Sequence, residues 1–107
     1  MPKRGDVVIV DFLGATGPKR RPAVILSSDV YHRERPDMIL GVITSNITAA
    51  TSATDYILQD WSAANLDRPS AFRAYLGMAL PSALKPIGHL SDRDWQAIRE
   101  RARRALA

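Results

Sequence analysis

Residues 5–28 read GDVVIVDFLGATGPKRRPAVILSS, and this stretch decides the fold. It holds two apolar runs, residues 7–12 and 23–26, both rich in the β-branched side chains that favour strands. Between them, residues 14–18 form a Gly- and Pro-containing break, and the basic cluster 19–21 follows. The stretch therefore predicts two strands joined by a basic loop. Alternation in the first strand predicts one face made of Val8, Val10 and Phe12.

Three further apolar runs, residues 38–44, 56–58 and 70–80, predict strands along the middle of the chain. The last of them alternates, which puts Arg73 and Tyr75 together on one face of the expected strand. Its other face is expected to carry Phe72, Ala74, Leu76 and Met78.

The C-terminal segment predicts an amphipathic helix. Ser91 is a natural N-cap, Asp94 stands three residues later as in a capping box, and Leu90 can pack against Trp95 across the helix start. A shorter helical turn, capped by its first residue, is expected over Asp60–Leu66. The residues expected to face inward from the C-terminal helix are Trp95, Ile98, Ala102 and Leu106.

Short strands followed by one helix indicate an α+β, mainly β fold. We expect a small barrel or strongly bent sheet of about five to seven short strands with a C-terminal α-helix packed on it. The 107 residues leave room for one compact domain, so a single domain spanning 1–107 is expected.

Composition narrows the chemistry that is available. The chain has no Cys and only two His, which excludes disulfides, thiol nucleophiles and Cys-zinc sites and argues against a metal site. The net charge of +4 is uneven: +3 in residues 1–21, −2 in residues 22–92 and +3 in residues 93–107. Such local surpluses indicate an anionic partner such as RNA or an acidic peptide, with a merely solvated surface as the alternative. No export signal or membrane span is present, so we expect a cytoplasmic protein.

Three polar clusters lie at the ends of the expected strands. In Lys19-Arg20-Arg21-Pro22, the proline biases Arg21 towards an extended backbone from which its guanidinium can bind a phosphate. Thr44-Ser45-Asn46 presents three hydrogen-bonding side chains where a strand stops, and Arg73 accompanies Tyr75. Each has a simpler interpretation: a solvated loop for the first, ordinary loop chemistry for the second, and a surface strand or dimer contact for the third.

The two histidines are candidate acid–base groups, because an unperturbed imidazole titrates near pH 6.5. His32 lies in a polar segment among charged residues, and His89 directly precedes the expected helix cap. A structural role suffices for both.

In order along the chain, residues 3–12, residues 21–27 (Arg-Pro-Ala-Val-Ile-Leu-Ser), residues 42–45 (Val-Ile-Thr-Ser) and the C-terminal helix resemble the MazF/PemK toxins of type II toxin–antitoxin systems. The resemblance covers nearly the whole chain. It implies a small SH3-like barrel of the kind shared with CcdB toxins and a homodimer. It also implies metal-independent, sequence-selective cleavage of single-stranded mRNA, with inhibition by a cognate MazE/PemI-like antitoxin.

The resemblance also assigns roles to individual residues. The family's catalytic arginine before proline matches Arg21, its threonine matches Thr44 with Ser45 as the neighbouring hydroxyl, and Arg73 matches the arginine of an Arg-x-Asp pair. Tyr75 stands where that pair has its carboxylate, which leaves the general base open. The RNA contacts are expected at Lys19, Arg20, Asn46 and Thr48.

Two alternatives stay open at this stage. A CcdB-like gyrase poison would use the same fold but act through its C-terminal segment. A non-catalytic RNA-binding barrel would bind RNA without cleaving it, and the Tyr75 departure is what keeps this alternative open.

Overall fold

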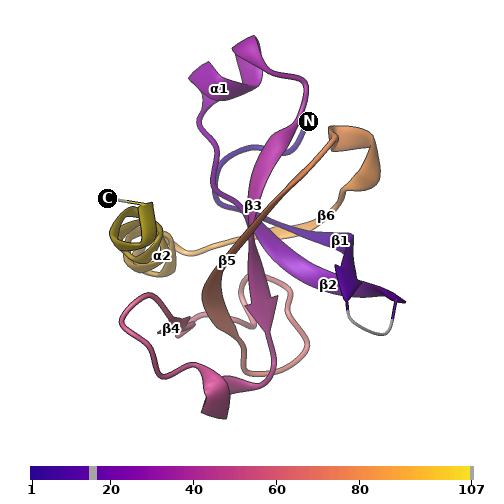
Figure 1. The fold of residues 1–107 in the computed structure, drawn as a ribbon. Helices are drawn as coiled ribbons and strands as arrows, with labels where there is room; N and C mark the ends of the chain where they lie inside the picture. The colour runs from indigo at the N-terminus through magenta and orange to yellow at the C-terminus, as the bar shows by residue number, and fades with distance from the viewer. Residues whose placement is uncertain (15–16, 107) are drawn as a thin grey trace.

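A computed structural model describes residues 1–14 and 17–106, and its centre is one curled antiparallel sheet (Figure 1). In the described chain this sheet has six strands in the spatial order β4-β5-β3-β2-β1-β6. The strands are β1 (Asp6–Gly14), β2 (Gly17–Ile25), β3 (Met38–Thr44), β4 (Tyr56–Ile57), β5 (Ala71–Ala79) and β6 (Lys85–His89). The helical elements are α1 (Asp29–Glu34), the 3₁₀ turns η1 (Ile47–Ala49) and η2 (Pro81–Ala83), and α2 (Asp92–Leu106). The mainly β fold with a C-terminal helix is confirmed.

Both faces of the sheet are buried at its centre, because α2 covers one face and the sheet curls over the other. The neighbours Val7 and Val8 are both fully buried although their side chains point to opposite faces. On the face covered by α2, here called the helix face, the core includes Val7, Val24, Ile43, Phe72, Ile98 and Ala102. On the other, here called the opposite face, the core is Val8, Val10, Ala23, Ile25, Met38, Leu40 and Leu84.

The basic cluster lies on a strand, so the prediction of a basic loop is wrong. β1 and β2 form a long hairpin in which Val10 pairs with Arg21 and Asp11 pairs with Arg20. A run of charged side chains is typical of loops, but it also suits strand positions that project beyond the core into solvent. Pro22 fits because the β2–β3 ladder begins only at Ala23, so its missing N–H breaks no bond to β3. The side chain of Phe12 is not among those that the structure describes, so its predicted orientation stays a prediction. Residues 15–16 of the predicted loop lie outside the described residues.

β5 alternates largely as expected. Phe72 is fully buried, and Arg73 and Tyr75 are exposed. The Phe72 ring packs directly over Gly41 of β3, where the Cβ of any other residue would collide with it. Met78 lies on the predicted face, because it pairs with Ile39, but it is 56% exposed since α2 does not extend over this end of the strand.

α2 starts as expected but ends differently. The Ser91 hydroxyl accepts the backbone N–H of Asp94 at 3.3 Å, which confirms the N-cap. Ile98 and Ala102 are buried as predicted, whereas Leu106 is 74% exposed, so its predicted inward position is wrong. Residues 61–65 form the expected turn, in which the Ala64 N–H donates to the carbonyls of Asp60 and Trp61 at 3.3 and 3.2 Å. No helix in the described ranges is long and apolar enough to cross a membrane.

Candidate functional site

The catalytic candidates of β2 and β3, Arg21 and Thr44, lie on the opposite face of the sheet. Arg21 pairs with Val10, and residues directly across from each other in a sheet share a face. Thr44 shares the face of Leu40 by the two-residue alternation of β3. Because Val10 and Leu40 both belong to the opposite-face core, Arg21 and Thr44 point away from α2.

The register of β2 and β3 brings Arg21 and Thr44 into neighbouring positions. Ala23 and Val42 form the last pair, and extending this antiparallel register by two residues places Arg21 across from Thr44. Both residues are half-buried, at the point where the β2–β3 ladder ends. A guanidinium and a hydroxyl from two neighbouring strands therefore lie on the same face, at the margin of the opposite-face core.

The hydroxyl of Thr44 is oriented by the segment that follows β3. Its Oγ1 accepts the backbone N–H of Asn46 at 3.1 Å, which leaves the hydroxyl proton available to a ligand. The side chain of Thr48 donates to Asn46 Oδ1 at 2.9 Å. Ser45, Asn46 and Thr48 are all exposed beside Thr44, so the expected polar cluster is assembled by this turn.

Arg73 has a carboxylate partner that sequence reasoning missed. Its Nε lies 3.9 Å from Asp55 Oδ1; the Arg73 side chain is 49% exposed and that of Asp55 only 5%. Because Tyr56 of β4 pairs with Phe72, Asp55, which directly precedes β4, comes opposite Arg73. The pairing of the short strand β4 with β5 was the signal needed, and it is invisible in the local sequence.

Several hydrogen bonds hold the segment that ends at Asp55. The Ser52 N–H donates to Asp55 Oδ2 at 3.1 Å. From α2, Arg101 donates to the Asp55 carbonyl at 3.3 Å and Arg104 donates to the Ala53 carbonyl at 3.1 Å. These two arginines of the basic C-terminal segment therefore stabilise the loop that carries Asp55.

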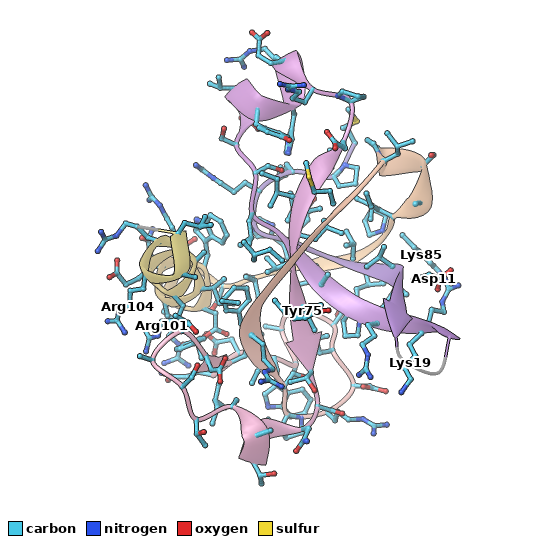
Figure 2. The ribbon with its side chains drawn as sticks, viewed as in Figure 1. Asp11, Lys19, Tyr75, Lys85, Arg101 and Arg104 are labelled. Atoms are coloured by element: carbon cyan, nitrogen blue, oxygen red, sulfur yellow. The ribbon has the colours of Figure 1, made fainter. Side chains whose placement is uncertain are left out.

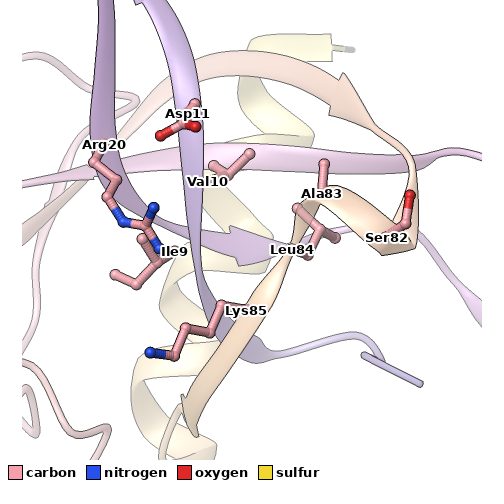
Figure 3. A pocket seen from close by; sticks show the side chains of 8 residues that line it. All are labelled: Ile9, Val10, Asp11, Arg20, Ser82, Ala83, Leu84 and Lys85. Carbon is pink, nitrogen blue, oxygen red and sulfur yellow. The ribbon is translucent and has the colours of Figure 1, made fainter.

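The basic cluster divides between the two sheet faces. Strand alternation puts Lys19 on the face of Arg21 and sends Arg20 to the other face. Lys19 projects at the hairpin end of the sheet, far from Arg101 and Arg104, while Tyr75, which is 67% exposed, lies over the middle of β5 (Figure 2). Arg20 instead lines a cleft next to Lys85 (Figure 3). The structure thus brings Lys19, Arg21, Thr44 and Arg73 to one face but not Arg20.

Both histidines have structural contacts. His32 Nε2 lies 2.5 Å from the Ser27 hydroxyl, which also accepts the Ile39 N–H. His89 Nδ1 lies 2.7 Å from Asp6 Oδ1 at the start of β1. Within residues 1–14 and 17–106, no group of three His, Asp or Glu side chains is arranged to hold a metal ion.

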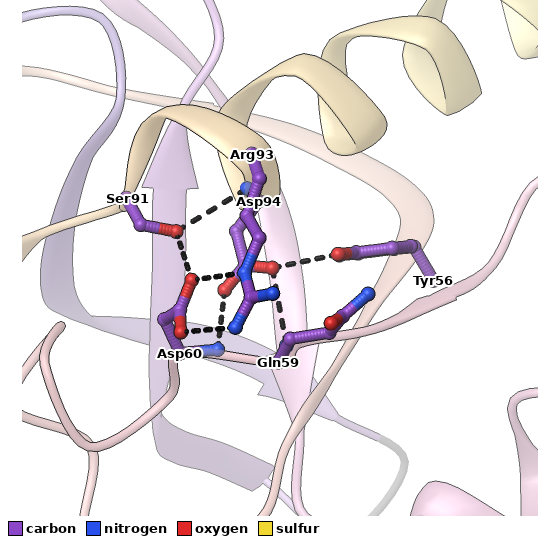
Figure 4. A network of polar contacts seen from close by, with 6 residues as sticks. All are labelled: Tyr56, Gln59, Asp60, Ser91, Arg93 and Asp94. Carbon is purple, nitrogen blue, oxygen red and sulfur yellow. Dashed lines mark hydrogen bonds and ion pairs between the residues drawn. The ribbon is translucent and has the colours of Figure 1, made fainter.

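A second polar network, on the helix face, joins α2 to β4 and is structural (Figure 4). The fully buried Asp94 accepts hydrogen bonds from the Tyr56 hydroxyl at 2.6 Å, from Gln59 N–H at 3.1 Å and from Asp60 N–H at 2.8 Å. Its side chain therefore anchors the β4 segment and does not fold back on Ser91 as a capping box would. Burial, with the Asp94 carboxylate next, raises the pKa of Tyr56 to about 12.

Asp60 pairs with the start of α2. It accepts two hydrogen bonds from Arg93, both at 2.7 Å, and one from the Ser91 hydroxyl at 2.6 Å. The Arg93 hydrogen bonds, followed by the Ser91 one, lower the pKa of Asp60 to about 2. The side chain of Asp60 thus binds across to α2 instead of capping its own turn.

Residues 3–106 match the family model of the PemK-like, MazF-like toxins of type II toxin–antitoxin systems. The chain belongs to this toxin family. The predicted resemblance is therefore confirmed over nearly the whole sequence. Comparison with curated protein sequences found no significant match.

Solved structures of MazF toxins share the fold of this chain. An endoribonuclease from a mycobacterial species, in complex with its cognate antitoxin, superposes with a TM-score of 0.79 at 18% identity, covering 99% of this chain and 95% of that one. MazF in a MazE–MazF complex from Deinococcus radiodurans gives 0.75 at 19% identity, with 98% and 95% covered. The Mycobacterium tuberculosis toxin MazF-mt6 gives 0.73 at 20% identity, with 94% and 95% covered.

Proposed function

We propose that this member of the MazF/PemK family is an endoribonuclease that cleaves single-stranded mRNA at selected sequences without a metal ion. The observation that carries the proposal is that Arg21 and Thr44 share a sheet face, away from α2, at the adjoining ends of β2 and β3. The toxin family and the endoribonuclease of the same fold support it. In this role the protein acts in the cytoplasm, where mRNA is found.

The proposed reaction is an internal displacement at phosphorus. The ribose 2′-oxygen forms a bond to the adjacent phosphorus and gives up its proton, while the bond from phosphorus to the 5′-oxygen breaks and that oxygen gains a proton. The products are a 2′,3′-cyclic phosphate and a 5′-hydroxyl. No electron transfer or hydrolytic water is needed, so side chains that position the phosphate and stabilise its charge suffice.

Arg21 stabilises the negative charge that develops on the phosphate oxygens and donates hydrogen bonds towards the leaving 5′-oxygen. Removing one preorganised donor of this kind costs about 3–4 kcal/mol of transition-state stabilisation in other enzymes. Thr44, whose hydroxyl accepts the Asn46 N–H, orients the phosphate by donating a hydrogen bond to it, or orients the attacking 2′-hydroxyl by accepting a hydrogen bond from it. Ser45 adds a second hydroxyl at the same strand end.

Arg73 is the second cation of the proposed site, and Asp55 positions it. Tyr75 stands where an Arg-x-Asp pair has its carboxylate, and the Asp55 carboxylate approaches Arg73 from the residue before β4 instead. The family arrangement of an arginine beside a carboxylate is thus rebuilt from a different strand. Lys19, Asn46 and Thr48 surround these residues as exposed contacts for the RNA strand.

The proposed active form is a homodimer joined at the helix face. Next to the C-terminal end of α2, an apolar groove of about 260 Å³ lies between the helix and the sheet, with Leu106 and Leu76 on its walls. Met78 pairs with Ile39, another lining residue, so its exposed side chain extends the same apolar surface. A twofold dimer buries one such patch against its copy. The MazE–MazF complexes make an antitoxin the proposed inhibitor.

The decisive experiment is incubation of purified protein with long single-stranded RNA of mixed sequence in EDTA. We expect fragments with cyclic-phosphate ends, and expect Arg21→Ala to abolish cleavage while Arg33→Ala, an exposed cation on α1, cleaves normally. RNA that stays intact over varied sequences contradicts the proposal. A DNA supercoiling assay in parallel tests the gyrase-poison alternative.

A further inference from the structure

A polar cleft of about 200 Å³ at the open edge of β1 lies outside the proposed active site (Figure 3). It exists because β6 pairs with β1 only as far as the pair Ile9–Lys85. Before Lys85 the chain turns away through η2, so the edge of β1 at Val10 and Asp11 pairs only with β2. The cleft is smaller than the roughly 300 Å³ at the lower end of small-molecule sites, which suits one unit of a longer ligand.

Two cations enter this cleft from strands on either side of β1. Arg20 comes from β2 and Lys85 from β6; they lie two strand spacings apart across the sheet and two residues apart along it, roughly 12 Å in all. Figure 3 shows both side chains on the same side of β1, with Ile9 between them. Both are exposed, and neither takes part in an ion pair with another residue of the described chain. Their charge is therefore available to an external anion.

The other lining groups indicate what kind of anion fits. Asp11 presents a carboxylate that only accepts hydrogen bonds, and Ser82 adds a hydroxyl across the cleft. A simple anion would offer Asp11 no hydrogen-bond donor. Its negative charge would also lie close to the negative carboxylate and repel it. A ribonucleotide offers a phosphate to the two cations, a 2′-hydroxyl donor to Asp11, and a sugar that can pack on Ile9. This mixed lining favours a nucleotide over an acidic peptide, whose carboxylates match only the cations.

The cleft also connects the two faces of the sheet. Val10 and Leu84 line it from the opposite face, where Arg21 lies, and Ile9 and Arg20 line it from the other face. An RNA strand leaving Arg21 can therefore cross the unpaired edge of β1 and reach Arg20 and Lys85 without passing around the hairpin.

We propose that this edge cleft binds a ribonucleotide that flanks the cleavage position, with its phosphate between Arg20 and Lys85 and its 2′-hydroxyl donating to Asp11. This inference rests on the proposed function, because it extends the path of the same RNA strand.

The test measures RNA binding separately from cleavage. In an Arg21→Ala background, the affinity for a fluorescent single-stranded RNA is followed by anisotropy over a range of salt concentrations, in EDTA. We expect Lys85→Ala and Arg20→Ala each to weaken binding several-fold and to reduce the slope of log affinity against log salt by about 0.7, the value for one lost phosphate contact on a single strand. Lys3→Ala, an equally exposed lysine elsewhere, is the matched control and should change neither quantity. Thermal unfolding confirms that each variant is folded.

A second comparison addresses Asp11. Deoxyribonucleotide and ribonucleotide strands of the same sequence should differ in affinity, and Asp11→Ala should reduce that difference. Unchanged RNA affinity and salt slope in Lys85→Ala overturn the edge cleft, even if wild-type protein cleaves RNA normally. Lys85-dependent binding of an oligoglutamate peptide, with no Lys85 effect on RNA, also overturns it in favour of a peptide site. Lys85-dependent RNA binding by a wild-type protein that cleaves no RNA supports the cleft and contradicts the proposed nuclease function instead.

Discussion

Asp55 faces Arg73 across the β4–β5 pair, with 3.9 Å between the carboxylate Oδ1 and the guanidinium Nε. The Asp55 side chain is almost fully buried, and its second oxygen is held by the Ser52 N–H. The position of the carboxylate is therefore set by the protein. Arg73 keeps about half of its surface free to meet a ligand.

This relationship makes Asp55→Asn an informative variant. Asparagine keeps the shape but loses the charge that draws Arg73 into position, and misplacing a catalytic group by about 1 Å can cost on the order of 100-fold in rate. We expect kcat for RNA cleavage to fall by about tenfold or more, with KM little changed. Steady-state kinetics on a short RNA containing the mapped cleavage sequence measure both constants.

The matched control for this variant is Asp67→Asn, because Asp67 forms an ion pair with Arg68 in which both side chains are exposed. It should cleave at the wild-type rate. Wild-type kcat in Asp55→Asn, or a loss confined to KM, contradicts the positioning role.

The strands could be predicted from the sequence wherever a run of apolar residues marked them. β3 and the short β4 were expected from their apolar residues, and α2 from its cap and periodicity. The basic segment of β2 was mistaken for a loop, since its charged side chains lie beyond the core and only pairing with β1 shows that Lys19 to Arg21 continue the strand.

In the candidate site, too, residues in short sequence motifs could be predicted, whereas residues placed by the pairing of distant strands could not. Arg21, Thr44 and Arg73 could be named because short motifs carry them, but their common face depends on strand register. Asp55 lies 18 positions before Arg73 and belongs to no motif, so only the pairing of β4 with β5 reveals it. Likewise, the capping-box pattern at Asp94 is local, and the partners that its side chain binds lie 34 to 38 residues away.

Asp94→Asn should destabilise the fold. An asparagine in this buried position turns one acceptor into an N–H₂ donor that faces a backbone N–H, so at least one buried donor loses its partner. We expect the free energy of unfolding to fall by about 2–3 kcal/mol in urea titrations. Asp92→Asn, an exposed carboxylate in the same helical turn, should change it by less than about 0.5 kcal/mol. Equal effects of the two substitutions contradict the anchoring role of Asp94.

Tyr56 should make stability depend on alkaline pH. Its pKa is about 12 in the folded protein against the ordinary tyrosine value of 10.0, so between these pH values the unfolded chain loses a proton that the folded chain keeps. The contribution of the Tyr56 hydroxyl is thus fully present below pH 10 and is lost as the pH rises through 12. We expect Tyr56→Phe to destabilise the protein at pH 8 and the difference from wild type to shrink between pH 10 and pH 12. Denaturant unfolding at a series of pH values measures this, and a constant difference over that window rules the linkage out.

The apolar surface beside α2 predicts which substitutions separate the proposed dimer. Leu106 and Met78 are 74% and 56% exposed, and burying a charged side chain against an apolar copy of the same patch is costly. We expect light scattering at micromolar concentration to give twice the 11.8 kDa chain mass for wild type and a single chain mass for Leu106→Glu and Met78→Glu. Val30→Glu on α1, where Val30 is similarly exposed but away from the groove, should stay dimeric. A single chain mass for the wild-type protein contradicts the proposed dimer. A dimer mass for both Leu106→Glu and Met78→Glu means that the interface lies on another face.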